Sequence, residues 1–196
     1  MTAATASTLL KVSDLRTSLY TGSAVVRAVD GLTFRIARGE TFALLGESGC
    51  GKSMTALSIM RLLPEAGRIV GGAVKLDGVD LLALPEVAMR AVRGRRVAMI
   101  FQEPGTSLNP VLTVGEQIME VLARHTSLRG EVAQRRVMEL LDQVGIPDPA
   151  RRVGEYSFQL SGGMKQLVMI ASALAGEPDL LIADEPTTAL DVTIQA

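Results

Sequence analysis

The sequence predicts an α/β fold, and three features support that prediction. An apolar run, Thr41–Leu45, enters a glycine-rich loop, and Lys52–Leu63 then shows helical spacing until Pro64. A second apolar run, Leu180–Ala183, ends in two adjacent acidic residues. Between these runs, much of the chain has the pattern of amphipathic helices. Short apolar runs of this kind are typical of strands buried on both faces of a parallel sheet.

The composition is that of a folded globular chain without a strong charge. The 196 residues can bury a core, and 47% of them are hydrophobic. With 20 basic and 21 acidic residues the formal net charge is -1, so no general field attracts nucleic acid or anionic lipid. One cysteine excludes an internal disulfide and a cysteine zinc cluster. No secretory signal is visible, and the longest apolar run is shorter than the roughly 18 residues of a membrane helix, so any membrane role should be peripheral.

Further strands and helices are expected on both sides of the glycine-rich loop. Short apolar or alternating runs predict the strands Leu9–Leu15, Val25–Val29, Leu32–Ile36, Ala73–Leu76 and Val97–Phe101. Asp30-Gly31 is expected to form a turn between the second and third of these strands. Helical spacing predicts the helices Val114–Arg124, Glu131–Val144 and Gly162–Ala175. The region from about 104 to 158 therefore resembles a helical insertion.

The glycine-rich loop matches the phosphate-loop pattern G-x-x-x-x-G-K-[ST] in full. Its residues are Gly46, Glu47, Ser48, Gly49, Cys50, Gly51, Lys52 and Ser53. Glycines let successive backbone N–H groups turn toward phosphate oxygens, and the following helix directs its positive end at the same anion. Lys52 is expected to reach the β- and γ-phosphates, and the hydroxyl of Ser53 to bind Mg²⁺. The alternative, an ordinary glycine-rich turn, is disfavoured by the flanking strand and helix.

The acidic pair Asp184-Glu185 ends a buried strand. Charged groups are costly to desolvate, so two acids at this place favour a chemical role over a solvent-facing strand end. Asp184 is expected to hold Mg²⁺ through water, and Glu185 to orient and polarise an attacking water.

Together these motifs resemble the ordered motifs of ABC transporter ATPases. The resemblance rests on the phosphate loop, Gln102, the heptad Leu160–Gln166, Asp184-Glu185 and Ala189-Leu190-Asp191, and runs from about Leu9 to Ala196. It implies a P-loop NTPase core with a mixed or parallel sheet, an N-terminal antiparallel β subdomain and an inserted α-helical subdomain. The core would comprise residues 1–103 and 159–196, and the helical subdomain residues 104–158.

The resemblance also implies a role for each matching residue. Ser161, Gly162 and Gly163 would grip the γ-phosphate of ATP bound to a partner subunit, although a serine-capped helix start would look the same. Gln102 would contact Mg²⁺ or the attacking water, and Asp191 would cross the dimer interface. The catalytic residues would be Glu185, Gln102 and Lys52. The nucleotide contacts would include Met54, beside the phosphate loop, and Tyr20, the nearest candidate to stack on adenine, which would otherwise be a sheet-edge tyrosine.

Four further segments of the sequence resemble one group within this family, the ATPases of dipeptide, oligopeptide and nickel importers. They lie at Met99–Pro104, Thr106–Pro110, Val144–Pro149 and Ile182–Ala196. This group implies ATP and Mg²⁺ as cofactors and a peripheral place on the cytoplasmic face of the inner membrane. The implied partners are a second ATPase in a homo- or heterodimer, membrane permeases, and indirectly an extracytoplasmic solute-binding protein, with no nucleic acid.

The chain departs from the family pattern in three places. The family has a switch histidine after the acidic pair, whereas the one histidine here, His125, lies upstream and is expected on a helix surface. The chain is therefore expected to be truncated, prone to aggregate and weakly active alone. Leu167 replaces the arginine common in the subfamily, and Tyr20 has loose spacing. Two alternatives stay open: a soluble ABC-type ATPase acting on nucleic acid or ribosomes, and a nucleotide-binding fragment without turnover.

Overall fold

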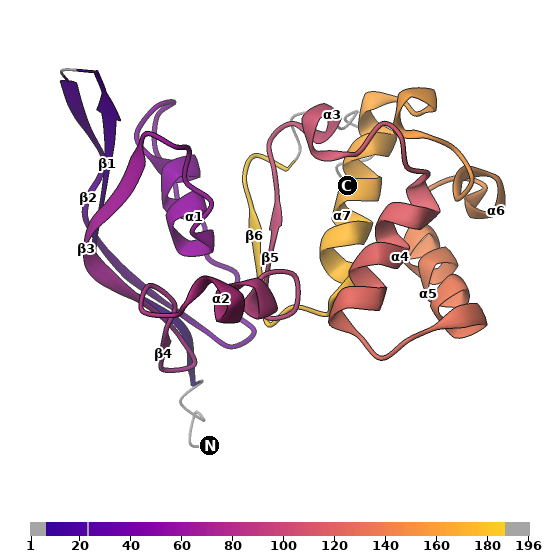
Figure 1. Cartoon of the computed structure of the whole chain (residues 1–196), viewed down its shortest axis with the longest axis horizontal. Coiled ribbons are helices and arrows are strands. Elements are labelled where there is room, and N and C mark those ends of the chain that lie inside the picture. The colour runs from indigo at the N-terminus through magenta and orange to yellow at the C-terminus, as the bar shows by residue number, and fades with distance from the viewer. Residues whose placement is uncertain (1–6, 23, 187–196) are drawn as a thin grey trace. The chain divides into compact units, whose positions relative to one another are not determined.

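The structure, a computed structural model, describes residues 7–22 and 24–186. Contacts divide the chain into two compact units, Met1–Arg90 and Ala91–Ala196 (Figure 1). Each unit is one continuous segment of the chain, whereas the sequence predicted a core of two segments around a helical insertion. The predicted subdomain boundaries stay a prediction.

The first unit contains a four-stranded antiparallel sheet in the order β2-β1-β3-β4. Its strands are β1 (Thr8–Thr21), β2 (Ala24–Ala37), β3 (Gly67–Leu76) and β4 (Val79–Asp80). The central strand β1 pairs with β2 on one side and β3 on the other. The sheet buries five of its apolar side chains almost completely: Leu10, Val12, Leu15, Val74 and Leu76.

The prediction of two strands joined by a turn, Val25–Val29 and Leu32–Ile36, is wrong. Both segments belong to the continuous strand β2. Gly31, with a φ of 79°, lies where the pairing register with β1 shifts, and Asp14, with a φ of 47°, lies at a neighbouring shift on β1. Turns and bulges both use glycine at positive φ, so an Asp-Gly pair alone cannot distinguish them.

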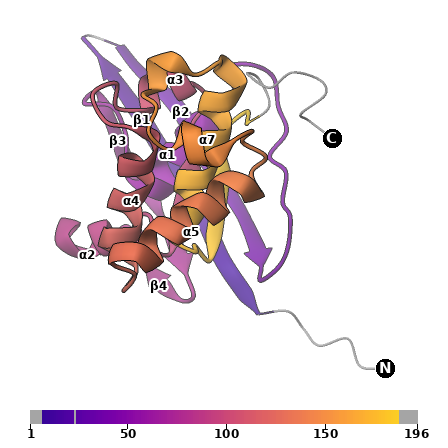
Figure 2. The same ribbon diagram turned by 90° about the vertical axis from the view of Figure 1, so that its right-hand side faces the viewer.

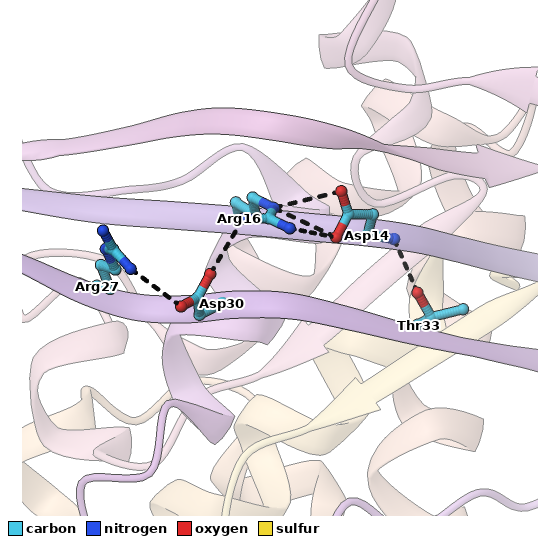
Figure 3. Close-up of polar contacts among 5 residues, drawn as sticks. All are labelled: Asp14, Arg16, Arg27, Asp30 and Thr33. Atoms are coloured by element: carbon cyan, nitrogen blue, oxygen red, sulfur yellow. Dashed lines mark hydrogen bonds and ion pairs between the residues drawn. The ribbon is translucent and has the colours of Figure 1, made fainter.

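Charged side chains connect these two bulges (Figure 3). Arg16 Nη2 lies 3.0 Å from Asp14 Oδ1, and Arg16 Nη1 lies 3.4 Å from Asp30 Oδ1. Arg27 Nη1 lies 3.6 Å from Asp30 Oδ2, and the Asp14 N–H donates to Thr33 Oγ1 at 2.8 Å. The hydrogen bond to Asp14 and the nearby carboxylates raise the pKa of Arg16. Since the groups are solvent-exposed, these ion pairs contribute little to the free energy of unfolding.

The prediction of a buried strand at Thr41–Leu45 is also wrong for this structure. The segment is not in a strand, and Leu45 is 88% exposed. Phe42 stacks on Phe34 of β2, with ring centroids 4.9 Å apart. A buried strand needs ladder partners for its backbone groups, and no described residue pairs with this segment.

Helix α1 (Lys52–Met60) packs on the sheet through a buried polar contact. The hydroxyl oxygens of Thr17 on β1 and Ser58 on α1 lie 2.8 Å apart, and both residues are fully buried. The helix ends three residues before the predicted Leu63. Arg61, with a φ of 53°, is the C-cap, and its N–H donates to Ser58 O at 3.1 Å. A left-handed residue after the last turn is a common helix end. A further helix, α2 (Glu86–Val92), was not predicted.

In the second unit, β5 (Val97–Ile100) pairs in parallel with β6 (Leu180–Ala183). The helices around this pair are α3 (Pro104–Ser107), α4 (Val114–His125), α5 (Gly130–Gln143), α6 (Pro149–Arg152) and α7 (Gly162–Ala175), with a 3₁₀ turn η1 at Ser157–Gln159. The predicted helices and both strands are thus confirmed to within a few residues. Within the part of the chain that the structure describes, no helix has the length and apolarity to cross a membrane.

Helices α4, α5 and α7 lie side by side and share one hydrophobic core (Figures 1 and 2). Its fully buried members include Ile118, Leu122, Val137, Leu140, Leu141, Val168 and Ala171. Helix α4 starts with a capping box: Thr113 Oγ1 accepts from the Glu116 N–H at 3.2 Å, and the Glu116 carboxylate accepts from the Thr113 N–H at 2.8 Å. Apolar periodicity and this cap together explain the helix.

His125, expected on a helix surface, is the last residue of α4 and is partly buried. Its ring lies against the turn at Gly94, where an added Cβ would meet the ring at 2.5 Å. Burial lowers the pKa of His125, and the charges of Arg124 and Arg95 lower it further.

Candidate functional site

The glycine-rich loop leads directly into the N-terminus of α1. Gly49 and Gly51 have φ values of 82° and 97°, which non-glycine residues rarely adopt. The Thr55 N–H donates to Gly51 O at 2.8 Å, closing the first helical turn. The backbone N–H groups at a helix start have no intrahelical partner, so the loop and α1 form a place suited to an anion.

The three glycines of the loop meet different surroundings. A Cβ at Gly51 would lie 2.2 Å from the carbonyl oxygen of Ala28 on β2, so the base of the loop packs directly on the sheet. A Cβ at Gly46 would meet the Cys50 sulfur at 2.4 Å, whereas a Cβ at Gly49 would meet nothing within 4 Å. Gly51 thus allows a close backbone approach, and Gly49 provides only its backbone conformation.

Lys52 folds back over the loop. Its Nζ donates to Gly46 O at 2.8 Å and to Glu47 O at 2.9 Å, and lies 4.0 Å from the Cys50 sulfur. These contacts place the ammonium group directly beside the loop backbone. A fixed positive charge next to a glycine-rich turn and a helix start fits the phosphates of a nucleotide.

The acidic pair follows β6, as the sequence predicted, but the strand is not buried as expected: only Leu180 is buried, and Leu181 is 39% exposed. The Asp184 N–H donates to Ile100 O at 3.0 Å, so the hydrogen bonding between β5 and β6 continues to the first residue of the acidic pair. Gln102 Nε2 donates to Glu185 Oε2 at 2.7 Å. The structure therefore brings together two predicted catalytic residues that are 83 positions apart.

The heptad begins α7. Ser161 is its N-cap and accepts from the Met164 N–H at 3.3 Å, and a Cβ at Gly162 would meet nothing within 4 Å. An open helix start with a serine oxygen and free N–H groups is chemically suited to a phosphate. The serine-capped helix start is the alternative that the sequence left open. A serine that caps a helix can also contact a bound phosphate.

Gln166 is a site residue to which the sequence analysis assigned no role. It is fully buried, and its Nε2 donates to Pro186 O at 2.9 Å, directly after the acidic pair. The available signal was its place directly before the longest apolar run, Leu167–Ala175, because an amide buried beside such a run needs a hydrogen-bond partner.

The other predicted site residues lie in different parts of the chain. Tyr20 lies near the end of β1 and is 49% exposed. Asp191 lies outside the described residues. Ser53 and Met54 belong to the first turn of α1 in the first unit, whereas Gln102 and Asp184 belong to the second. The union of Ser53, Gln102 and Asp184 in one Mg²⁺ site stays a prediction.

Comparison with known proteins places the chain in a family. The ABC transporter family model matches residues 29–188. The dipeptide transport ATP-binding protein DppD of Bacillus subtilis is 51% identical over 189 residues, and the oligopeptide transport ATP-binding protein AppD of the same organism is 54% identical over 191 residues. These alignments cover 96% and 97% of this chain but only 56% and 58% of the relatives, so the chain spans little more than half their length.

A solved structure agrees with these relatives. The dimeric structure of MJ0796, a bacterial ABC transporter cassette, matches with a TM-score of 0.86 and 28% identity, over 95% of this chain and 78% of that one. This chain therefore belongs to the ABC transporter family, and the predicted α/β class and P-loop NTPase fold are confirmed. Its close relatives within the family include ATP-binding proteins named for dipeptide and oligopeptide transport.

Proposed function

We propose that this chain is the ATP-binding and ATP-hydrolysing part of a peptide-type ABC importer. The observation that carries the proposal is the phosphate loop: an ammonium group held on a glycine-rich turn at the start of α1. The names of the relatives support peptide transport as the process that hydrolysis would drive.

In the proposed site, each group has one task. The loop amides and Lys52 would bind the phosphates, and Ser53, Gln102 and Asp184 would hold Mg²⁺, directly or through water. When bound, Mg²⁺ would neutralise charge on the phosphates. Glu185 accepts a hydrogen bond from Gln102, and its carboxylate would orient and polarise the attacking water.

The proposed partners follow from the family. A second ATPase subunit would contribute its Ser-Gly-Gly edge to this chain's nucleotide, and Ser161, Gly162 and Gly163 would serve the partner's nucleotide in return. ATP hydrolysis would drive a conformational change in the membrane permease subunits. A solute-binding protein would supply the peptide from outside the membrane. The chain would then lie peripherally on the cytoplasmic face of the inner membrane.

Nucleotide binding is tested with Lys52→Ala and a matched control, Lys75→Ala, on the exposed side of β3. Titration with a fluorescent Mg²⁺–ATP analogue should show at least tenfold weaker binding for Lys52→Ala and unchanged binding for Lys75→Ala. Equal affinity in both variants would refute the assignment of the phosphate loop.

Hydrolysis and transport need separate measurements. Glu185→Gln should bind nucleotide as the wild type does but release phosphate at least a hundredfold more slowly, since the carboxylate that activates water is gone. Peptide uptake by cells that carry the importer should stop with either Lys52→Ala or Glu185→Gln. Uptake that survives both substitutions would refute the transport role while leaving nucleotide binding intact.

A further inference from the structure

The buried amide of Gln166 does not fit an ordinary core position. The residue lies on α7 beside Leu167 and Val168, and all three are buried. Its Nε2 donates to Pro186 O at 2.9 Å, while its Oε1, also buried, accepts no hydrogen bond from the described residues. A buried polar atom without a partner is costly, so an amide at this place needs a reason beyond packing.

The partner of Gln166 lies at a particular point of the chain. Pro186 has no N–H, so its carbonyl is the one backbone group by which it can be held. It directly follows Glu185, which has a φ of 48°, a left-handed conformation that is rare for a residue with a side chain. Such a conformation persists where neighbouring contacts hold the chain on both sides.

Both sides of Glu185 are in fact held. Before it, the Asp184 N–H donates to Ile100 O of β5 at 3.0 Å. After it, the Pro186 carbonyl accepts from Gln166 of α7. The carboxylate itself accepts from Gln102 Nε2 at 2.7 Å. Three contacts from three parts of the second unit thus define where this carboxylate points.

We propose that Gln166 is a positioning residue for Glu185. Through the Pro186 carbonyl it fixes the backbone that carries the carboxylate, and it joins the helix that begins at the Ser-Gly-Gly edge to the acidic pair. The inference rests on the proposed function for the catalytic meaning of Glu185, but the contact can be tested without turnover.

The test uses Gln166→Met, with Leu167→Met as the matched control on the same buried helix. Methionine nearly fills the volume of glutamine and donates no hydrogen bond. It also removes the unpartnered Oε1, so the thermal midpoint should stay within about 4 °C of the wild type. Amide hydrogen exchange at Asp184 and Glu185 should become at least tenfold faster in Gln166→Met alone, and exchange in α4 should not change.

Kinetics give the second measurement. Gln166→Met should lower kcat for ATP at least tenfold and leave KM within twofold, because the phosphate loop is untouched, and Leu167→Met should change neither value. If Gln166→Met does not fold, Gln166→Asn replaces it: the shorter amide cannot reach Pro186 O, so the same changes are expected.

The outcomes separate the two proposals. Unchanged exchange at Asp184 and Glu185 overturns the positioning role, and so does faster exchange with unchanged kcat. Absence of turnover in the wild type counts against the proposed hydrolysis only, and the exchange measurement then decides the role of Gln166. Faster exchange together with a fall in kcat at constant KM supports it.

Discussion

Replacing Gly51 with alanine should destabilise the first unit far more than the same change at Gly49. Both glycines have positive φ, so an alanine at either position costs about 1–2 kcal/mol of backbone strain. At Gly49 the new methyl group meets nothing within 4 Å, and strain is the whole cost. At Gly51 it would lie 2.2 Å from Ala28 O, a backbone atom within β2 that cannot turn away.

The loop base or the strand must therefore move in Gly51→Ala. Overpacking of this kind adds about 1–3 kcal/mol or more to the strain. For a chain of this length about 1 kcal/mol corresponds to 2–4 °C, so Gly51→Ala should unfold about 2–12 °C below Gly49→Ala. Thermal unfolding followed by circular dichroism without nucleotide measures the difference. Equal midpoints for the two variants would show that the loop does not pack on β2 as described.

Three further outcomes are expected in the second unit. Ser161→Ala should cost about 1 kcal/mol through loss of the α7 N-cap, and Ser161→Asn, which can cap, should restore the midpoint in urea unfolding. Leu140→Ala, at a fully buried site, should cost about 2–5 kcal/mol by the same measurement, and a smaller loss would mean a looser core. Because the pKa of His125 is lower in the folded state, the unfolded chain binds the proton first, and stability should fall as pH drops below about 6.5. His125→Asn should weaken that pH dependence, and an unchanged slope would contradict the burial of the ring.

Local patterns were sufficient to predict most elements of the second unit. The apolar spacing of α4 and α5 and the apolar run of β6 each contain their own signal, because a helix or a short apolar strand of this kind is specified by neighbours in the sequence. The phosphate loop was equally visible, since cradling an anion requires fixed residue types at fixed spacing.

The predictions from sequence were wrong where a residue's conformation depends on distant parts of the chain. Gly31 has positive φ in a bulge rather than a turn, and only the pairing of β2 with β1 decides between the two. Thr41–Leu45 has the composition of a buried strand, but a strand exists only where backbone partners meet it. The surroundings of His125 depend on the turn at Gly94, which lies thirty-one positions earlier in the sequence.

The sequence by itself determined the family, the phosphate loop and the acidic pair, because each of these is a short run of residues whose chemistry requires its own order. Only the tertiary structure showed that Gln102 reaches Glu185 and that Gln166 holds Pro186. The first contact joins the segments that follow β5 and β6, and the second joins α7 to the segment after β6. Hydrogen-bond geometry between such segments is set by how the elements pack and not by the neighbouring residues in the sequence.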